Sequence, residues 1–310
     1  MMKIAGIDIG GTKTAVIIGE YENDKCTISN REVFATADRP DPYSAIDHIC
    51  SMLSDATFDA IGISCGGPLD SRKGIILSPP NLPGWDEIRI TEILGRRFGV
   101  TVRLCNDANA CAVAEWKLGS GRGYDNIVFM TFGTGLGAGL ILNGRLYTGT
   151  SDMAGEIGHV RLSEFGPVGY GKAGSAEGFV SGNGIKQLAL LRLYELSQKG
   201  ISHPLHKLGN QITAYDVFSY ARDKDPLAVD IINTTGEKLG EICAILTDLL
   251  NPEAIIIGSI YERNHDLLYP VLEKTFKKEA LSRSFSSVRI LPASLGDSIG
   301  DYAALMTAVL

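Results

Sequence analysis

Two glycine-rich turns stand at corresponding places in the two halves of the sequence. The first is Asp8-Ile9-Gly10-Gly11-Thr12-Lys13, and the second is Thr131-Phe132-Gly133-Thr134-Gly135-Leu136-Gly137. Glycines between two strands allow tight backbone angles, so that main-chain N–H groups can approach an anion closely. The hydroxyls of Thr12 and Thr134 add donors, and the ammonium of Lys13 is a point charge suited to phosphate. Either turn alone is also explained by an ordinary hairpin, whereas the matched pair favours binding of a polyphosphate.

Two aspartates near these turns could supply metal binding and proton transfer. Asp8 ends the first apolar run and could hold Mg²⁺, directly or through water. Asn106-Asp107 lies between a predicted strand and a predicted helix, where α/β folds place ligand-facing residues. Asp107 could simply cap that helix. In the functional interpretation it is a general base that accepts a proton from a hydroxyl nucleophile during phosphoryl transfer.

A second polar group follows the second turn. Glu156 and His159 lie in Glu156-Ile157-Gly158-His159, after a loop rich in Gly, Asp and Ser, and Glu177 follows another glycine-rich stretch. Carboxylates and imidazole accept hydrogen bonds in defined directions, so together they could bind the several hydroxyls of a sugar. Any one of them alone could instead be a solvated or capping residue.

The elements that must position these residues follow an α/β pattern. Three short apolar runs joined by turns predict an antiparallel meander, and alternating helices and strands follow it. The strands are expected at 3–9, 14–19, 26–35, 58–64 and 100–104, and the helices at 43–53, 88–98 and 109–118.

The second half repeats the opening and is richer in helix. Strands are expected at 126–131, 137–142, 253–257 and 288–291, and helices at 184–198, 214–223, 226–250 and 267–281, with a last helix opening at Asp297. For the helix at 226–250, Asp225 is the predicted N-cap, Pro226 takes the first helical position, and Asn251-Pro252 ends it. The chain is therefore predicted to form two α/β domains: a smaller one of residues 1–118 plus 296–310, and a larger one of residues 119–295.

Composition narrows the possible classes of protein. The chain has 310 residues, 45% hydrophobic and 21% charged, and a net charge of −7, which argues against a general nucleic-acid binder. No run approaches the ~18 apolar residues of a membrane-spanning helix. The N-terminus does not read as a signal peptide, and the six cysteines show no CxxC or CxC spacing. A cytoplasmic protein with reduced thiols is expected.

Five motifs in order carry a resemblance to a known family. They are Asp8-Ile-Gly-Gly-Thr-Lys13, Asn81-Leu-Pro-Gly-Trp85, Asn106-Asp-Ala-Asn-Ala110, Phe132-Gly-Thr-Gly-Leu-Gly137 and Gly155-Glu-Ile-Gly-His159. With these motifs the sequence resembles the ROK family (repressors, open reading frames and sugar kinases) across nearly its whole length. The resemblance implies a two-lobed α/β fold of the actin/hexokinase type, which is ribonuclease H-like, with an ATP-dependent sugar kinase site in the cleft between the lobes.

The resemblance also implies a role for each matching residue. Asp107 looks like the catalytic base, and Asp8 is the residue expected near Mg²⁺. The residues that look like sugar contacts are Gly66, Asn81, Asn106, Glu156, His159 and Glu177. Those that look like the phosphate-binding turns are Gly10, Gly11, Thr12, Lys13, Gly133, Thr134 and Gly135. Gly258-Ser259 resembles the adenosine-side turn, although a second glycine is usual where Ser259 stands.

One segment departs from the family pattern. Many members bind zinc through the His of Gly-x-x-Gly-His and three cysteines of a following segment. Here the three thiol positions hold Val168, Tyr170 and Ser175, and neither Val nor Ser is a strong Zn²⁺ ligand. We therefore expect no structural zinc, His159 as a sugar contact only, and a loop that is ordered by packing, with Tyr170 as a candidate.

The resulting hypothesis is transfer of the γ-phosphoryl group of Mg·ATP to the 6-hydroxyl of a hexose, as in a glucokinase. Amino sugars, fructose, allose and β-glucosides are alternative acceptors that one sequence does not separate. A sugar-responsive transcriptional regulator is a remote alternative, because the first phosphate turn begins at Asp8 and leaves no room for an N-terminal DNA-binding module. The resemblance implies a homodimer, and neither nucleic acid nor membrane is an expected partner.

Overall fold

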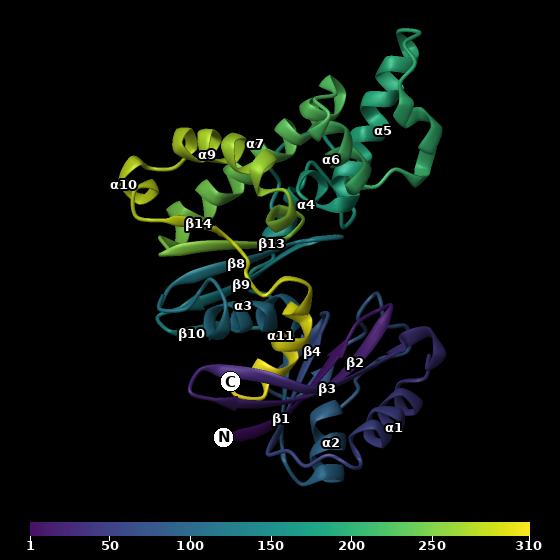
Figure 1. Cartoon of the computed structure of the whole chain (residues 1–310), viewed down its shortest axis with the longest axis vertical. Coiled ribbons are helices and arrows are strands. Elements are labelled where there is room, and N and C mark those ends of the chain that lie inside the picture. Colours follow the sequence, from purple (N-terminus) through teal and green to yellow (C-terminus); the bar gives the residue numbers. More distant parts are fainter. The chain divides into compact units, whose positions relative to one another are not determined.

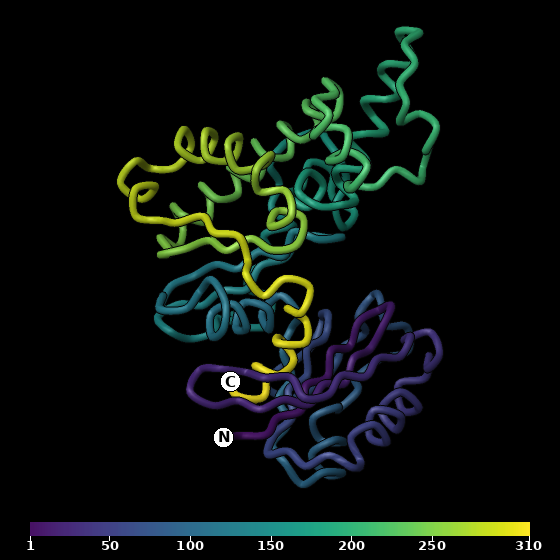
Figure 2. The backbone as a smooth tube through the Cα atoms, in the orientation of Figure 1, coloured from purple at the N-terminus to yellow at the C-terminus, as the bar shows by residue number.

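The computed structural model describes all residues from Met1 to Leu310. The chain divides into two compact units, each assembled from segments that lie apart in the sequence (Figure 1). The first unit comprises Met1–Asp125, Gly139–Ala154 and Ser294–Leu310, and the second comprises Asn126–Ala138 and Gly155–Ala293. The C-terminal segment therefore belongs to the same unit as the N-terminus, and Figure 2 marks both ends of the tube there.

Five strands form the sheet of the first unit, in the order β3-β2-β1-β4-β7. Their bounds are Met2–Ile9 (β1), Lys13–Glu22 (β2), Lys25–Ala35 (β3), Ala60–Cys65 (β4) and Thr101–Asn106 (β7). β1, β2 and β3 are antiparallel neighbours, which confirms the predicted meander. β4 pairs in parallel with both β1 and β7. The carboxyl ends of β1, β4 and β7 therefore meet at one edge, where Asp8 is paired with Ser64 and Cys65 with Asn106.

The helices of the first unit cover this sheet. They are α1 (Pro42–Leu53), α2 (Ile90–Phe98), α3 (Asp107–Leu118) and α11 (Ile299–Thr307). α11 lies directly on the strands, because a Cβ at Gly62 of β4 would overlap the carbonyl oxygen of Ala304. The isoleucines at 7, 61 and 63 are fully buried, as expected of β-branched residues in a sheet that helices cover. A short hairpin of Leu69–Asp70 (β5) and Ile75–Ile76 (β6) follows β4.

The second five-stranded sheet has the order β10-β9-β8-β13-β14. Its strands are Ile127–Phe132 (β8), Leu136–Leu142 (β9), Arg145–Tyr147 (β10), Ala254–Ser259 (β13) and Arg289–Pro292 (β14). β13 lies parallel to β8 and to β14, and residues 255–257 of β13 are fully buried. The register pairs Gly258 with Thr131, so the end of β13 lies beside the start of the second glycine turn.

Helices form most of the rest of the second unit. The longer ones are α5 (Gly182–Gln198), α6 (Ala214–Arg222), α7 (Pro226–Leu250) and α9 (His265–Glu279). The short elements are Val168–Gly169 (β11), Lys172–Ala173 (β12), Ala176–Phe179 (α4), Ile260–Arg263 (α8) and Ser282–Phe285 (α10). α7 and α9 pack closely, since a Cβ at Gly240 would lie 2.7 Å from the carbonyl oxygen of Leu272.

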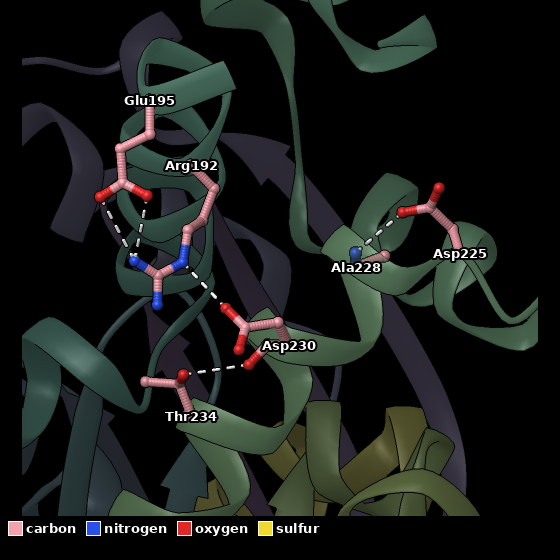
Figure 3. Close-up of polar contacts among 6 residues, drawn as sticks. All are labelled: Arg192, Glu195, Asp225, Ala228, Asp230 and Thr234. Atoms are coloured by element: carbon pink, nitrogen blue, oxygen red, sulfur yellow. Dashed lines mark hydrogen bonds and ion pairs between the residues drawn. The ribbon is translucent and has the colours of Figure 1, made fainter. Parts of the chain in front are cut away.

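The long helix α7 has the predicted bounds and the predicted cap. The carboxylate of Asp225 accepts a hydrogen bond from the Ala228 N–H at 2.9 Å (Figure 3). The same figure shows Arg192 of α5 donating to the Asp230 carboxylate of α7 at 2.8 Å. This ion pair joins α5 and α7, whereas the sequence pattern predicts each helix but not their contact.

Six helix starts differ from the sequence-based expectation: α1, α5 and α9 begin one or two residues earlier, and the other three differences have a visible cause. α3 begins at Asp107 and not at Asn109, because the side chain of Asn106 supplies the cap. α2 begins at Ile90 because the backbone of Ile88 is engaged with that of Ile76. The last helix begins at Ile299, after a 3-10 turn at Gly296–Ser298, and not at Asp297.

Candidate functional site

Asp107 is the first residue of α3 and directly follows β7. Oδ1 of Asn106 accepts hydrogen bonds from the backbone N–H groups of Ala108 at 3.0 Å and Asn109 at 3.4 Å. Oδ1 of Asp107 also accepts from the Ala108 N–H, at 2.8 Å. Asp107 retains solvent-exposed surface. The protein atoms around its carboxylate desolvate it and so raise its pKa above the ordinary value. The hydrogen bond from the Ala108 N–H opposes this rise. A carboxylate with a raised pKa is a better proton acceptor near neutral pH.

Asp8 lies at the end of β1, beside Ser64 of β4. Burial raises its pKa to about 6; a hydrogen bond from Ser64 opposes this rise, and the negative charges of Asp107 and Asp301 add to it. The approach of α11 is close, since a Cβ at Gly300 would lie 2.9 Å from Oδ2 of Asp8. A partly buried carboxylate in acidic surroundings is a suitable oxygen ligand for a hard cation such as Mg²⁺.

The first glycine turn joins β1 to β2 and is held from outside by Thr36. The Gly10 N–H donates to the carbonyl of Lys13 at 3.0 Å, which closes the turn. Thr36 donates from its hydroxyl to the Gly10 carbonyl at 2.7 Å and from its N–H to the Thr12 carbonyl at 3.0 Å. Thr36 thus occupies the carbonyl oxygens of Gly10 and Thr12, two acceptors that would repel an anion if they faced it.

The sugar candidates of the first unit lie around these residues. A Cβ at Gly11 would lie only 2.7 Å from Cβ of Asn81, so Asn81 packs directly on the glycine turn. A Cβ at Gly66 would lie 3.9 Å from Oδ2 of Asp107, with nothing nearer. The structure therefore brings together the first-unit members of the predicted site: Asp8, Gly10, Gly11, Thr12, Lys13, Gly66, Asn81, Asn106 and Asp107.

The second glycine turn joins β8 to β9 in the second unit. The Gly133 N–H donates to the Gly135 carbonyl at 3.0 Å, and the Gly133 carbonyl accepts from the Gly182 N–H at 2.8 Å. Glu177 lies against this turn, because its Oε2 accepts from the Leu136 N–H at 3.1 Å. A Cβ at Gly135 would lie 2.7 Å from the same oxygen. The predicted phosphate turn and a predicted sugar contact are thus immediate neighbours.

Glu156 directly precedes the 3-10 turn Ile157–His159, and His159 is the last residue of that turn. Both residues are exposed. The backbone carbonyl of His159 accepts from Nζ of Lys172 at 2.7 Å. The imidazole ring of His159 contacts the ring of Tyr170 edge-on, with 6.2 Å between the ring centroids. Gly158 approaches Glu177, since a Cβ at Gly158 would lie 3.4 Å from the Glu177 Cβ. The backbone of the turn that carries Glu156 and His159 therefore lies beside Glu177.

At the end of β13, Ser259 stands at the position where the family usually has a second glycine, and its backbone conformation is unusual for serine. Ser259 has φ +60° and ψ −110°, a conformation that glycine adopts readily and other residues rarely do. A Cβ at Gly133 would lie 3.7 Å from its hydroxyl oxygen, so this turn borders the second glycine turn. The structure thus places Gly258 and Ser259 beside the predicted phosphate site and keeps the backbone that a second glycine would favour.

The loop without the family cysteines is held by hydrogen bonds. Gln187 of α5 accepts from the Val168 N–H at 2.9 Å and donates to the Val168 carbonyl at 2.8 Å. The Ser175 hydroxyl caps α4 by accepting from the Gly178 N–H at 3.2 Å, and it donates to the Gly169 carbonyl at 3.3 Å. In all 310 residues no group of three His, Cys, Asp or Glu side chains could hold a metal ion.

The sequence analysis did not identify two residues that support the candidate site. Asp301 of α11 is 8% exposed, forms an ion pair with Arg31 at 2.7 Å, and adds to the raised pKa of Asp8. The available signal was an aspartate inside the apolar run of the last helix. Gln187 carried no such signal, because a glutamine on a helix is ordinarily a surface residue.

Comparison with known proteins identifies the family. The ROK family profile matches residues 4–308. A glucokinase of Thermotoga maritima is 31% identical over 276 residues, covering 88% of this chain and 87% of that protein. The structure of a ROK family glucokinase from Streptomyces griseus, in complex with glucose and AMPPNP, matches with a TM-score of 0.78 at 29% identity and covers 99% of both chains.

A regulator is also among the relatives. The DNA-binding transcriptional repressor Mlc of Escherichia coli is 33% identical over 223 residues, which cover 72% of this chain and 53% of the repressor. No helix of the structure is both long enough and apolar enough to cross a membrane. The predicted fold class is confirmed by the match to the Streptomyces griseus structure. On these grounds the chain belongs to the ROK family.

Proposed function

We propose that this chain is an ATP-dependent hexose kinase that transfers the γ-phosphoryl group of ATP to the 6-hydroxyl of glucose or a closely related hexose. The observation that carries the proposal is the match over the full chain to a glucokinase solved with glucose and AMPPNP. The polar residues of both units supply the groups that such a reaction needs.

Asp107 is the proposed general base. As the hydroxyl oxygen of the sugar attacks the γ-phosphorus, the carboxylate accepts the hydroxyl proton, and the bond between the γ-phosphorus and the bridging oxygen of ADP breaks. Asn106 holds the start of α3, so the Asp107 carboxylate does not have to serve as the main cap. Its raised pKa brings proton affinity closer to neutral pH.

The two glycine turns are the proposed sites for the polyphosphate. Backbone N–H groups and hydroxyls of Thr12 and Thr134 would donate to phosphate oxygens, and Lys13, which is exposed, would add a positive charge. Asp8 would hold Mg²⁺ together with the phosphates, directly or through water, since Mg²⁺ in such sites uses one or two carboxylates. When bound, the ion supplies neutralisation of the charge on the phosphate oxygens.

The sugar hydroxyls would bind to the side chains of Asn81, Asn106, Glu156, His159 and Glu177 and to the backbone at Gly66. The carboxylates accept hydrogen bonds from hydroxyl groups, and the side-chain amides both donate and accept. These residues can therefore bind several sugar hydroxyls at once. Glu177 has one oxygen already engaged by the Leu136 N–H, which fixes its direction. Amino sugars, fructose, allose and β-glucosides remain alternative acceptors for the same residues.

Two further properties complete the proposal. The chain is proposed to act as a homodimer, as the family resemblance implies. A cytoplasmic location is proposed because all six cysteines are free thiols, four of them buried. A sugar-responsive regulator is the second candidate, favoured by the similarity to the repressor Mlc.

A coupled assay of ADP release tests the proposal. Purified full-length protein with Mg·ATP is assayed with glucose, mannose, fructose, allose, N-acetylglucosamine, N-acetylmannosamine and a β-glucoside, and 6-deoxyglucose is the matched control that lacks the attacking hydroxyl. The proposal expects the highest kcat/KM with glucose and no turnover with 6-deoxyglucose. It is wrong if no sugar stimulates ADP release above the rate with water.

A further inference from the structure

Ser259 is the last residue of β13, directly before the short helix α8, and its backbone conformation is strained. Its φ of +60° and ψ of −110° suit glycine, whereas a residue with a Cβ rarely adopts them. Serine at this position therefore costs stability that glycine would not, and its side chain is expected to have a use that offsets this cost. The kinase mechanism proposed above assigns no role to Ser259.

The Ser259 hydroxyl has no partner within the protein and is accessible. It makes no capping hydrogen bond to α8. The buried side-chain polar atoms that lack a partner belong to Asn109, Thr247 and Tyr261. The hydroxyl of the half-buried Ser259 is not among them, so it retains contact with solvent. A ligand can therefore reach it.

This hydroxyl faces the second glycine turn. A Cβ added to Gly133 would lie 3.7 Å from Oγ of Ser259 and 3.8 Å from Oγ1 of Thr131. These are ordinary contact distances, so space for about one methyl group is open between the two hydroxyls and the Gly133 backbone. Strand pairing fixes the arrangement, because β13 and β8 are parallel and Gly258 is paired with Thr131.

The turn beside Ser259 has free backbone donors. Both backbone groups of Gly133 are engaged, its N–H with the Gly135 carbonyl at 3.0 Å and its carbonyl with the Gly182 N–H at 2.8 Å. The N–H groups of Thr134 and Gly135 donate to no group of the protein. Consecutive free N–H groups in a turn favour an anion, and a hydroxyl beside them adds a further donor.

We propose that the Ser259 hydroxyl donates a hydrogen bond to a phosphate oxygen of the bound nucleotide, next to the N–H groups of the second glycine turn. This inference rests on the proposed function and deepens it, because it assigns the nucleotide a contact that glycine at position 259 would lack. A hydrogen bond to a charged phosphate oxygen is stronger than one to a neutral hydroxyl, which favours the phosphates over the ribose as the group bound.

Calorimetric titration of the full-length chain with ADP in the presence of Mg²⁺ tests this proposal. Ser259→Ala removes the hydroxyl but keeps the Cβ and the backbone strain. It is expected to weaken ADP binding about tenfold, since hydrogen bonds to charged groups are the strong ones, and to leave the thermal midpoint near the native value. Ser259→Gly removes both the hydroxyl and the strain. It is expected to weaken ADP binding by a similar factor while raising the thermal midpoint, because relief of the strain outweighs the entropy that glycine gains in the unfolded chain.

Two comparisons locate the contact. Adenosine has the base and the ribose but no phosphate, so Ser259→Ala is expected to bind it as the native chain does. Ser282→Ala changes an exposed serine of α10 in the same unit and is the matched control. It is expected to bind ADP with native affinity.

The inference is overturned if Ser259→Ala or Ser259→Gly binds ADP with native affinity. It is also overturned if adenosine binding falls by the same factor as ADP binding, which would assign the hydroxyl to the ribose. A fall in the thermal midpoint of both variants together with the loss of ADP binding would show a structural role and overturn it as well. In each of these cases a native chain that binds ADP and phosphorylates glucose keeps the kinase proposal, whereas a native chain that binds no ADP contradicts both.

Discussion

Asn106 caps the helix that Asp107 begins. Its Oδ1 accepts hydrogen bonds from the N–H groups of Ala108 and Asn109. The capping role that could have explained Asp107 is largely performed by the residue before it. Oδ2 of Asp107 is the oxygen that faces Gly66, where the nearest approach of an added Cβ would be 3.9 Å. Space next to that oxygen is what an attacking hydroxyl would need.

Asp8→Asn is expected to stabilise the protein at pH 7.5. The pKa of Asp8 is raised to about 6 from its ordinary value of 3.8, chiefly by burial, so the folded state disfavours the ionised form. This penalty is absent below about pH 4, grows as the pH rises through about 6, and is constant above that. Removing it is expected to add about 1–3 kcal/mol to the free energy of unfolding at pH 7.5 and nothing at pH 4. Denaturant unfolding at both pH values measures the difference.

The same variant is expected to lose kinase activity, because the carboxylate proposed to hold Mg²⁺ is gone. A gain in stability together with a loss in turnover separates a functional carboxylate from a structural one. Asp55→Asn, at an exposed position, is the matched control and should change neither quantity. Lower stability of Asp8→Asn at pH 7.5 would contradict the account of Asp8.

Gly66→Ala is expected to weaken sugar binding without unfolding the protein. The new methyl group would make only an ordinary contact, 3.9 Å from Oδ2 of Asp107, so the fold should tolerate it. It would occupy space proposed for the substrate, and one methyl group in a pocket changes binding by about 10-fold or more. Steady-state kinetics should show a raised KM for glucose, with a thermal midpoint near that of the native chain. Gly95→Ala in α2, where the nearest atom would be 3.7 Å away, is the control; an unchanged KM in Gly66→Ala would argue that the sugar lies elsewhere.

Gln187→Leu is expected to raise the KM for glucose more than the KM for ATP. The side chain makes two hydrogen bonds to the backbone of Val168, each contributing about 1 kcal/mol, and so holds the loop that leads to Glu177. Loosening this loop should affect the proposed sugar residues first. Gln198→Leu, at the exposed end of the same helix, is the matched control. If both Michaelis constants rose equally, Gln187 would have only a general structural role.

Removal of metal is expected to leave the fold intact. The positions of the family cysteines hold Val168, Tyr170 and Ser175, and hydrogen bonds from Gln187 and Ser175 order the loop. Elemental analysis of purified protein should find no stoichiometric zinc, and a chelator should not lower the thermal midpoint of the protein without nucleotide. One zinc per chain, or a marked fall of the midpoint with chelator, would refute this expectation.

Local signals explain why much of the fold could be predicted. The 3.6-residue period of 226–250, with Asp225 before it and Asn251-Pro252 after it, defines α7 to the residue. The three apolar runs and their turns likewise define the meander. Helix starts were predicted less well, because the choice of Asn106 over Asp107 as cap depends on side-chain direction. Both residue types are good caps in sequence.

Contacts between distant segments could not be read from the sequence. Arg31 and Asp301 form an ion pair across 270 positions, and the raised pKa of Asp8 depends on that region of α11. The pairing of Gln187 with Val168 involves an ordinary helix residue and a loop backbone. Candidate residues such as Glu177 and Gly135 were each named from a motif, whereas their direct packing follows only from the folded second unit.

The central claim is that Asp107 removes the proton from a sugar hydroxyl, and Asp107→Asn tests it most directly. Sugar-dependent ADP release is measured for the native chain and the variant at saturating glucose and Mg·ATP, alongside glucose binding by calorimetry and Asp55→Asn as control. Loss of a general base predicts a fall in kcat of ~10²–10⁴ with glucose affinity largely retained. A variant that turns over near the native rate while binding glucose normally would contradict the account.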